Sequence, residues 1–252
     1  VTNLFSGIVS FFKTLAIFVV IFSLGIIILK EIISKIVLGR ELSKSLSKKD
    51  KVFLLVKIPS SNDQKEDAME NFFHSIHRVF PKDACISFEM VSSNQFLSFY
   101  ITVQKSAKNL LESQLYAQYP DAEIEEAEDY LEDIEKNTAF VELGFKNSSA
   151  FSLNTYDKLN EDLLKNLSAV LAKTDSGDKA YIQIVLKKTG SKFYERGYRY
   201  FSFKFFGGNN PTNPAYEKLS QDLFLGKLRL GYTSTNKESA KSKLHTLVNF
   251  FK

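Results

Sequence analysis

The chain has 252 residues, of which 44% are hydrophobic and 25% are charged. This mixture excludes wholesale disorder and leaves room for a membrane anchor followed by one or two small domains. The formal net charge of +4 does not by itself indicate nucleic acid, and the single cysteine, Cys85, excludes an internal disulfide and any multi-cysteine zinc site.

The strongest signal is an uncharged apolar run at residues 14–29. As a helix these sixteen residues span about 24 Å, and residues 9–12 extend the run to the roughly 30 Å of a hydrocarbon core. The run predicts a transmembrane helix, which we expect to continue as a juxtamembrane helix to residue 38.

The charges that flank this run predict its orientation. Seven basic residues lie between Lys30 and Lys51, whereas only Lys13 precedes the run. The positive-inside rule then predicts a single-pass protein of the cell inner membrane, with the N-terminus outside and the C-terminal domain in the cytoplasm. Residues 39–50 read as a basic linker.

Residues 51–135 alternate strand and helix signals in the order βαββαβ, which is the ferredoxin-like arrangement. The strand patterns cover residues 51–59, 85–91, 96–104 and 121–130, and the helix patterns cover residues 60–80 and 106–120. In the first helix, Met69, Phe72, Phe73, Ile76 and Phe80 share one face. The last strand is strongly acidic, which is typical of a solvated edge strand that resists pairing with another sheet.

Residues 136–252 repeat this order but end as βααless of one strand: the pattern is βαββα. The strand patterns cover residues 138–145, 180–188 and 223–235, the helix patterns cover residues 156–173 and 237–252, and an insertion occupies about 189–222. We therefore predict an α+β fold of two ferredoxin-like units, the second truncated at its C-terminus. We also expect the native polypeptide to continue beyond Lys252.

A resemblance to a known family rests on two stretches, ISFEMVSSNQFLSFYITVQKSAKNLLESQLYAQYPDAEIEEAEDY (residues 86–130) and LNEDLLKNLSAVLAKTDSGDKAYIQIVLKK (residues 159–188). With the apolar N-terminal segment, they resemble the membrane-proximal region of bacterial type IV secretion and conjugation ATPases of the HerA–FtsK group. The resemblance implies that a RecA-like motor follows, which hydrolyses ATP to move DNA or protein through a membrane pore. It also implies that the lipid bilayer, further copies of the chain and secretion-channel proteins are its partners.

This chain has no G-x-x-x-x-G-K-[ST] sequence to hold a nucleotide phosphate, so we expect no ATPase activity before residue 252. No G-x-S-x-G is present, and His74, His77 and Glu70 do not follow the H-E-x-x-H spacing. We therefore predict no catalytic residue, no metal and no cofactor, and a non-catalytic role in membrane anchoring and assembly.

The alternative function rests on the stretch Lys187–Phe206, which interleaves six basic residues and one acidic residue with eight aromatic residues. Cationic side chains suit phosphates and aromatic rings stack on bases, as in proteins that bind single strands. The alternative is a membrane-tethered nucleic-acid-binding module, whose candidate contacts are Lys188, Lys192, Arg196, Arg199 and Lys204. The same pattern also suits an insertion that buries its aromatic residues by packing or at a subunit or lipid interface.

Overall fold

The computed structural model describes residues 15, 17–26, 28–29, 50–64, 66–131, 137–145, 153, 163–171, 174–190, 194 and 218–251. The chain divides into two compact units, Val1–Ser45 and Leu46–Lys252.

The first unit is helical over residues 17–26, and its apolar side chains, among them Phe18 and Phe22, are exposed. Ten helical residues span about 15 Å, half the thickness of a hydrocarbon core of about 30 Å. Within the described part of the chain, we find no helix that combines the length and the apolarity needed to cross a membrane. The predicted transmembrane helix is therefore wrong, and so is the single-pass inner-membrane location drawn from it. The predicted basic linker lies almost wholly outside the described residues.

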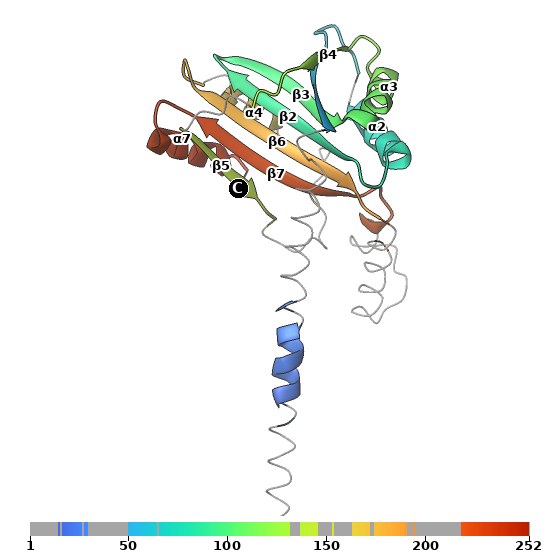
Figure 1. The fold of residues 1–252 in the computed structure, drawn as a ribbon, viewed down its shortest axis with the longest axis vertical. Coiled ribbons are helices and arrows are strands. Elements are labelled where there is room, and N and C mark those ends of the chain that lie inside the picture. The colour runs from blue at the N-terminus through green and yellow to red at the C-terminus, as the bar shows by residue number, and fades with distance from the viewer. Residues whose placement is uncertain are drawn as a thin grey trace, which may run out of the picture. The chain divides into compact units, whose positions relative to one another are not determined.

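The second unit is built on one sheet, whose described strands follow the order β4-β1-β3-β2-β6-β7-β5 (Figure 1). The strands are β1 (Lys51–Lys57), β2 (Cys85–Ser93), β3 (Phe96–Gln104), β4 (Glu123–Ala127), β5 (Thr138–Leu143), β6 (Lys179–Lys188) and β7 (Phe224–Thr233). The helices are α2 (Glu66–Val79), α3 (Lys108–Gln118), α4 (Leu163–Leu171) and α7 (Lys237–Asn249), and a 3-10 turn, η2 (Lys105–Ala107), precedes α3.

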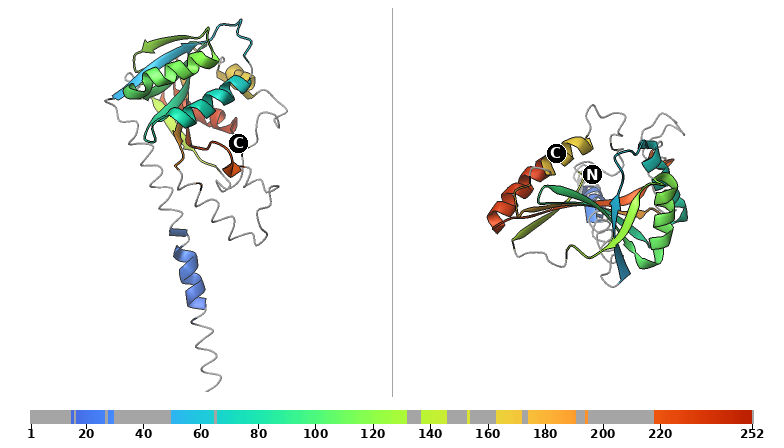
Figure 2. Two further views of the ribbon diagram at one scale, coloured as in Figure 1. Left: turned by 90° about the vertical axis from the view of Figure 1, so that its right-hand side faces the viewer. Right: turned by 90° about the horizontal axis from the view of Figure 1, so that it is seen from above.

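Every pair of neighbouring strands is antiparallel, and the register assigns each residue to one of two faces. One face, the helix face, carries Ile101 of β3, Phe88 of β2 and Ile184 of β6 in one row. Helices α2 and α3 pack on this face over β1 to β3, and α4 and α7 pack on it over β5 to β7 (Figure 2). The other face, which we call the pocket face, carries the alternate residues.

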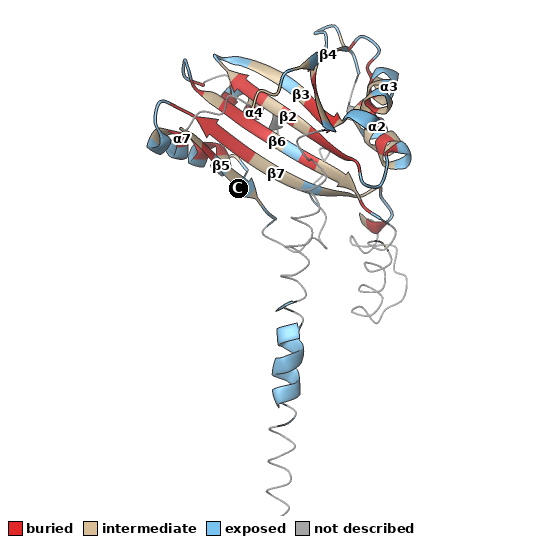
Figure 3. Ribbon diagram, in the orientation of Figure 1, coloured by how far each residue is buried: buried red, intermediate tan, exposed pale blue. Residues whose placement is uncertain are grey.

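Two apolar clusters stabilise the helix face, and burial is concentrated on the central strands (Figure 3). The first cluster contains Leu54, Val56, Phe72, Ile76, Phe80, Ile86, Ile101, Val103, Leu111 and Leu115 among others. The second contains Leu167, Leu171, Ile182, Leu230, Tyr232, Ala240, Leu244 and Leu247 among others. The helical face predicted around Phe72 and Ile76 is confirmed by their burial.

The predicted fold class is wrong, because the strands of both halves form one continuous antiparallel sheet instead of two ferredoxin-like units behind a transmembrane helix. The join is β2 with β6, which pair along nine residues, from Cys85 opposite Lys187 to Ser93 opposite Lys179. A two-residue period tells which face of a strand is buried, but it does not tell which edge is paired. The predicted boundaries at residues 135 and 136 stay a prediction.

Phe72 tests the core that holds α2 to the sheet. Its side chain is fully buried, so Phe72→Ala should lower the free energy of unfolding by about 3–5 kcal/mol through lost burial and a residual cavity. Phe96→Ala, at a side chain that is 78% exposed, is the matched control and should change it by less than about 0.5 kcal/mol. Urea unfolding measures both, and equal effects would contradict this assignment of the core.

Candidate functional site

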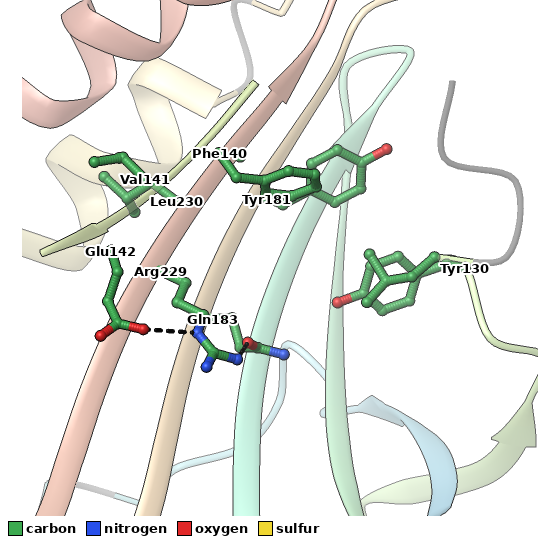
Figure 4. Close-up of a pocket in the computed structure, with 10 residues that line it drawn as sticks. Tyr130, Phe140, Val141, Glu142, Tyr181, Gln183, Arg229 and Leu230 are labelled. Atoms are coloured by element: carbon green, nitrogen blue, oxygen red, sulfur yellow. Dashed lines mark hydrogen bonds and ion pairs between the residues drawn. The ribbon is translucent and has the colours of Figure 1, made fainter. Parts of the chain in front are cut away.

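A pocket of about 340 Å³ opens on the pocket face over β5, β6 and β7 (Figure 4). It is lined by Tyr130, Leu131, Phe140, Val141, Glu142, Tyr181, Gln183, Arg229, Leu230 and Gly231. Three of these residues are aromatic, and all but Tyr130 and Leu131 come from the three strands. The pocket is therefore a property of the sheet and of the segment that follows β4.

A glycine creates the hollow. Tyr181, Gly231 and Phe140 are neighbours in one row across β6, β7 and β5. A Cβ atom at position 231 would lie 2.4 Å from the Phe140 ring and 3.1 Å from the Tyr181 ring. The absent side chain thus lets the two rings approach each other over the floor, with centroids 6.2 Å apart.

Tyr130 supplies the wall that does not belong to the sheet. Its ring stacks on Tyr181, with centroids 5.9 Å apart and planes at 11°, and it meets Phe53 edge-on. It also contacts the ring of Tyr100 at 5.1 Å. These contacts hold the segment after β4 against the pocket face, which sequence reasoning missed because Tyr130 ends an acidic run that reads as a solvated edge.

A row of polar side chains crosses four strands beside the pocket. Glu89, Gln183, Arg229 and Glu142 are successive cross-strand neighbours on β2, β6, β7 and β5. Gln183 donates from Nε2 to Glu89 at 2.8 Å and accepts from Arg229 Nη1 at 3.2 Å, while Arg229 Nε donates to Glu142 at 3.2 Å. Each polar group thus has a partner in the next strand.

Glu89 is the buried end of this row. Its side chain belongs to a residue that is only 2% exposed, and its carboxylate accepts from the Tyr130 hydroxyl at 2.6 Å and from Gln183. A buried carboxylate is costly unless hydrogen bonds replace its water. Burial raises the pKa of the Tyr130 phenol, and the Glu89 charge and hydrogen bond raise this pKa further. Tyr130 therefore remains a donor at neutral pH.

Glu142 is the exposed end of the row. Burial raises the pKa of this carboxyl, but the hydrogen bonds from Lys227 and Arg229 outweigh burial and leave the pKa below its usual value. Lys227 Nζ lies 2.9 Å and Arg229 Nε lies 3.2 Å from the carboxylate oxygens. The charge at the rim is thus met by two cations of the same sheet.

The structure places only one of the five predicted contact residues. Lys188 ends β6 and donates from Nζ to the backbone carbonyl of His77 at 3.1 Å. Lys192, Arg196, Arg199 and Lys204 lie outside the described residues. From the same stretch, the Tyr194 hydroxyl accepts from Leu223 N at 2.8 Å. The described members that bond in this way therefore contact the protein itself.

The two histidines of α2 bind one carboxylate. Asp222 lies 2.9 Å from His74 Nδ1 and 3.1 Å from His77 Nδ1. Their contact ties α2 to the segment before β7. Among the described residues we find no group of three or more side chains that could hold a metal ion, and Cys85 is buried.

Comparison with known proteins gives a family and one weak structural likeness. The profile of a family described as "Domain of unknown function (DUF8128)" matches residues 33–205. No curated protein matches the chain. Among solved structures, the chain is similar to a glycopeptide hexose oxidase, DBV29, complexed with teicoplanin, with 11% identity and a TM-score of 0.36. The likeness covers 80% of this chain and 41% of that one, and it establishes no shared fold or activity.

These comparisons contain no secretion or conjugation protein. The assignment of the chain to a membrane-spanning part of a type IV secretion or conjugation machine is therefore corrected, because its transmembrane helix is missing from the described residues. The resemblance to the ATPase family stays a prediction that the comparisons do not test.

The hydrogen bond of Tyr130 gives a direct test of the polar row. Tyr130→Phe keeps the ring but removes a donor to the buried Glu89 carboxylate, so the free energy of unfolding should fall by about 2 kcal/mol. Tyr116→Phe, at an exposed tyrosine of α3, is the control and should change it by less than about 0.5 kcal/mol. If the two variants unfold at the same urea concentration, the Tyr130–Glu89 bond has no structural role.

The raised pKa of Tyr130 also predicts a loss of stability in alkali. Above about pH 10 the unfolded chain loses the phenol proton while the folded chain keeps it, so stability is complete below that pH and falls as the pH rises. In Tyr130→Phe the decline should be shallower by up to about 1.4 kcal/mol per pH unit. Tyr232, whose pKa burial raises to about 12, contributes equally to both proteins. Urea unfolding between pH 9 and 11.5 measures the two slopes, and identical slopes would contradict the prediction.

Proposed function

The chain belongs to the DUF8128 family, and from its pocket we propose that the second unit is a non-catalytic docking module. In this proposal the pocket receives a large apolar or aromatic side chain of a partner protein. The predicted copies of the chain and secretion-channel proteins are candidates for that partner.

The observation that carries the proposal is the mutual pairing of the polar groups. Glu89, Gln183, Arg229 and Glu142 are bonded to one another or to Tyr130. A catalytic site instead presents a base or a nucleophile within reach of a substrate. Because these polar side chains already have partners, the surface left for a ligand consists mainly of the rings of Phe140, Tyr181 and Tyr130.

Size and charge support a protein side chain as the ligand. The volume of about 340 Å³ is at the lower end of the range for ligand pockets, about 300–1,000 Å³. Phe140 is 54% exposed at the rim, and aromatic anchors in such pockets commonly dominate protein interfaces. The charges of Arg229 and Glu142 offset each other, so the pocket does not select an ionic ligand.

Nucleic acid remains the alternative, through Lys187–Phe206. Its basic residues beyond Lys188 lie outside the described part of the chain, and the alternative stays a prediction. Inside the pocket, Tyr130 and Tyr181 stack on each other and Arg229 is paired with Glu142. These contacts favour a side-chain ligand over a base and its phosphate.

Peptide display against the 252-residue chain tests the docking function. We expect selected peptides to share a large apolar residue, and Phe140→Ala to weaken their binding at least about tenfold, as truncation of an interface anchor does. Phe96→Ala is the matched control, because it removes an exposed phenylalanine of β3 that does not line the pocket. Fluorescence anisotropy of labelled peptides measures each affinity.

A labelled oligothymidylate in the same assay separates the two functions. Peptides unaffected by Phe140→Ala would contradict docking in the pocket. Oligonucleotide binding that weakens steeply with salt, with a slope that substitution of Arg196 and Arg199 reduces, would support the nucleic-acid module instead.

A further inference from the structure

The two ends of the sheet differ in a way that concerns self-association. Strand β4 forms one end and β5 forms the other. Three of the five residues of β4 are glutamates, of which Lys57 and Lys108 pair with Glu125 and Glu126. A row of carboxylates at an edge resists pairing with an identical edge, since like charges would lie opposite each other. The β4 end is thus protected.

Strand β5 lacks this protection. Its one charged residue, Glu142, is neutralised by Lys227 and Arg229. Its ring at Phe140 is 54% exposed. Among the described strands β5 pairs with β7 and with no other, so the backbone groups along its outer side have no strand partner there.

The direction of those backbone groups follows from the ladder. Ser234 N donates to Asn137 O, one residue before β5 begins. In an antiparallel ladder alternate residues direct both backbone groups to the same neighbour. Asn137, Ala139 and Val141 therefore face β7, and Phe140 and Glu142 direct their N–H and C=O groups to the outer edge.

The sheet already contains a join of this kind. The elements β5, α4, β6, β7 and α7 repeat the order of β1, α2, β2, β3 and α3. The halves meet where the equivalent strands β2 and β6 pair antiparallel, edge to edge. Pairing of an edge with its equivalent is thus how this sheet is assembled.

We propose that β5 is a dimerisation edge, which pairs antiparallel with β5 of a second copy of the chain around a two-fold axis at Phe140. This register sets Phe140 beside its copy and Glu142 beside the copy's Thr138, with no glutamate opposite another. A two-fold contact uses the same surface twice and is therefore closed, and the acidic β4 ends stop further growth. The pairing covers the outer backbone groups of β5 and adds the second ring to the exposed one.

Cysteine cross-linking tests this edge against the other one. Across an antiparallel pair of facing residues the Cα atoms lie about 5.5 Å apart, which a disulfide spans. Under mild oxidation Phe140→Cys should form a covalent dimer at low micromolar concentration. Glu125→Cys on β4 is the matched control and should stay monomeric, and the buried Cys85 is present in both variants.

The mass of the unmodified chain is the second measurement. Sedimentation should give twice the chain mass of 28.7 kDa. Phe140→Pro, which removes the outward N–H but no bond to β7, should weaken the dimer at least tenfold more than Phe140→Ala, which keeps that N–H. Chain that sediments as a monomer, or cross-linking of Phe140→Cys no faster than of Glu125→Cys, would overturn the proposal. Peptide binding is measured separately, so either proposal can fail without the other.

Discussion

The antiparallel ladder between β2 and β6 is the interaction on which the rest of the structure depends. It joins seven strands into one sheet and fixes the register of one half against the other. That register sets Glu89 opposite Gln183, and the neighbouring ladders continue the row to Arg229 and Glu142. A slip by one residue would move each of these side chains to the helix face. The polar row and the pocket beside it thus follow from backbone pairing.

The polar row has a structural consequence and a functional one. It lets the sheet bury the Glu89 carboxylate, because Tyr130 and Gln183 replace the water that the carboxylate loses. By the same contacts it ties the segment after β4 to the pocket face and uses the polar groups that a catalytic site would need. What the pocket presents is aromatic surface, shaped by the missing side chain at Gly231. This division supports docking as the proposed role.

The sequence allowed most elements of residues 51–252 to be predicted, since period-2 and helical patterns report local structure. The stripe of Phe72 and Ile76 on α2 is buried as expected. The union of the two halves could not be predicted, because alternation does not reveal which strand lies at an edge. The pocket was missed for the same reason: Tyr130, Tyr181 and Gly231 are far apart in sequence and meet only through register. The membrane helix was overpredicted from an apolar run of which residues 17–26 form the longest described helical stretch.

The most direct measurement is the pattern of cross-strand nuclear Overhauser effects in isotope-labelled protein. If β2 and β6 pair as described, contacts should connect Phe88 with Ile184, Glu89 with Gln183 and Met90 with Ile182. Absence of β2–β6 contacts, or contacts displaced by one residue, would contradict the single sheet and with it the polar row and the pocket.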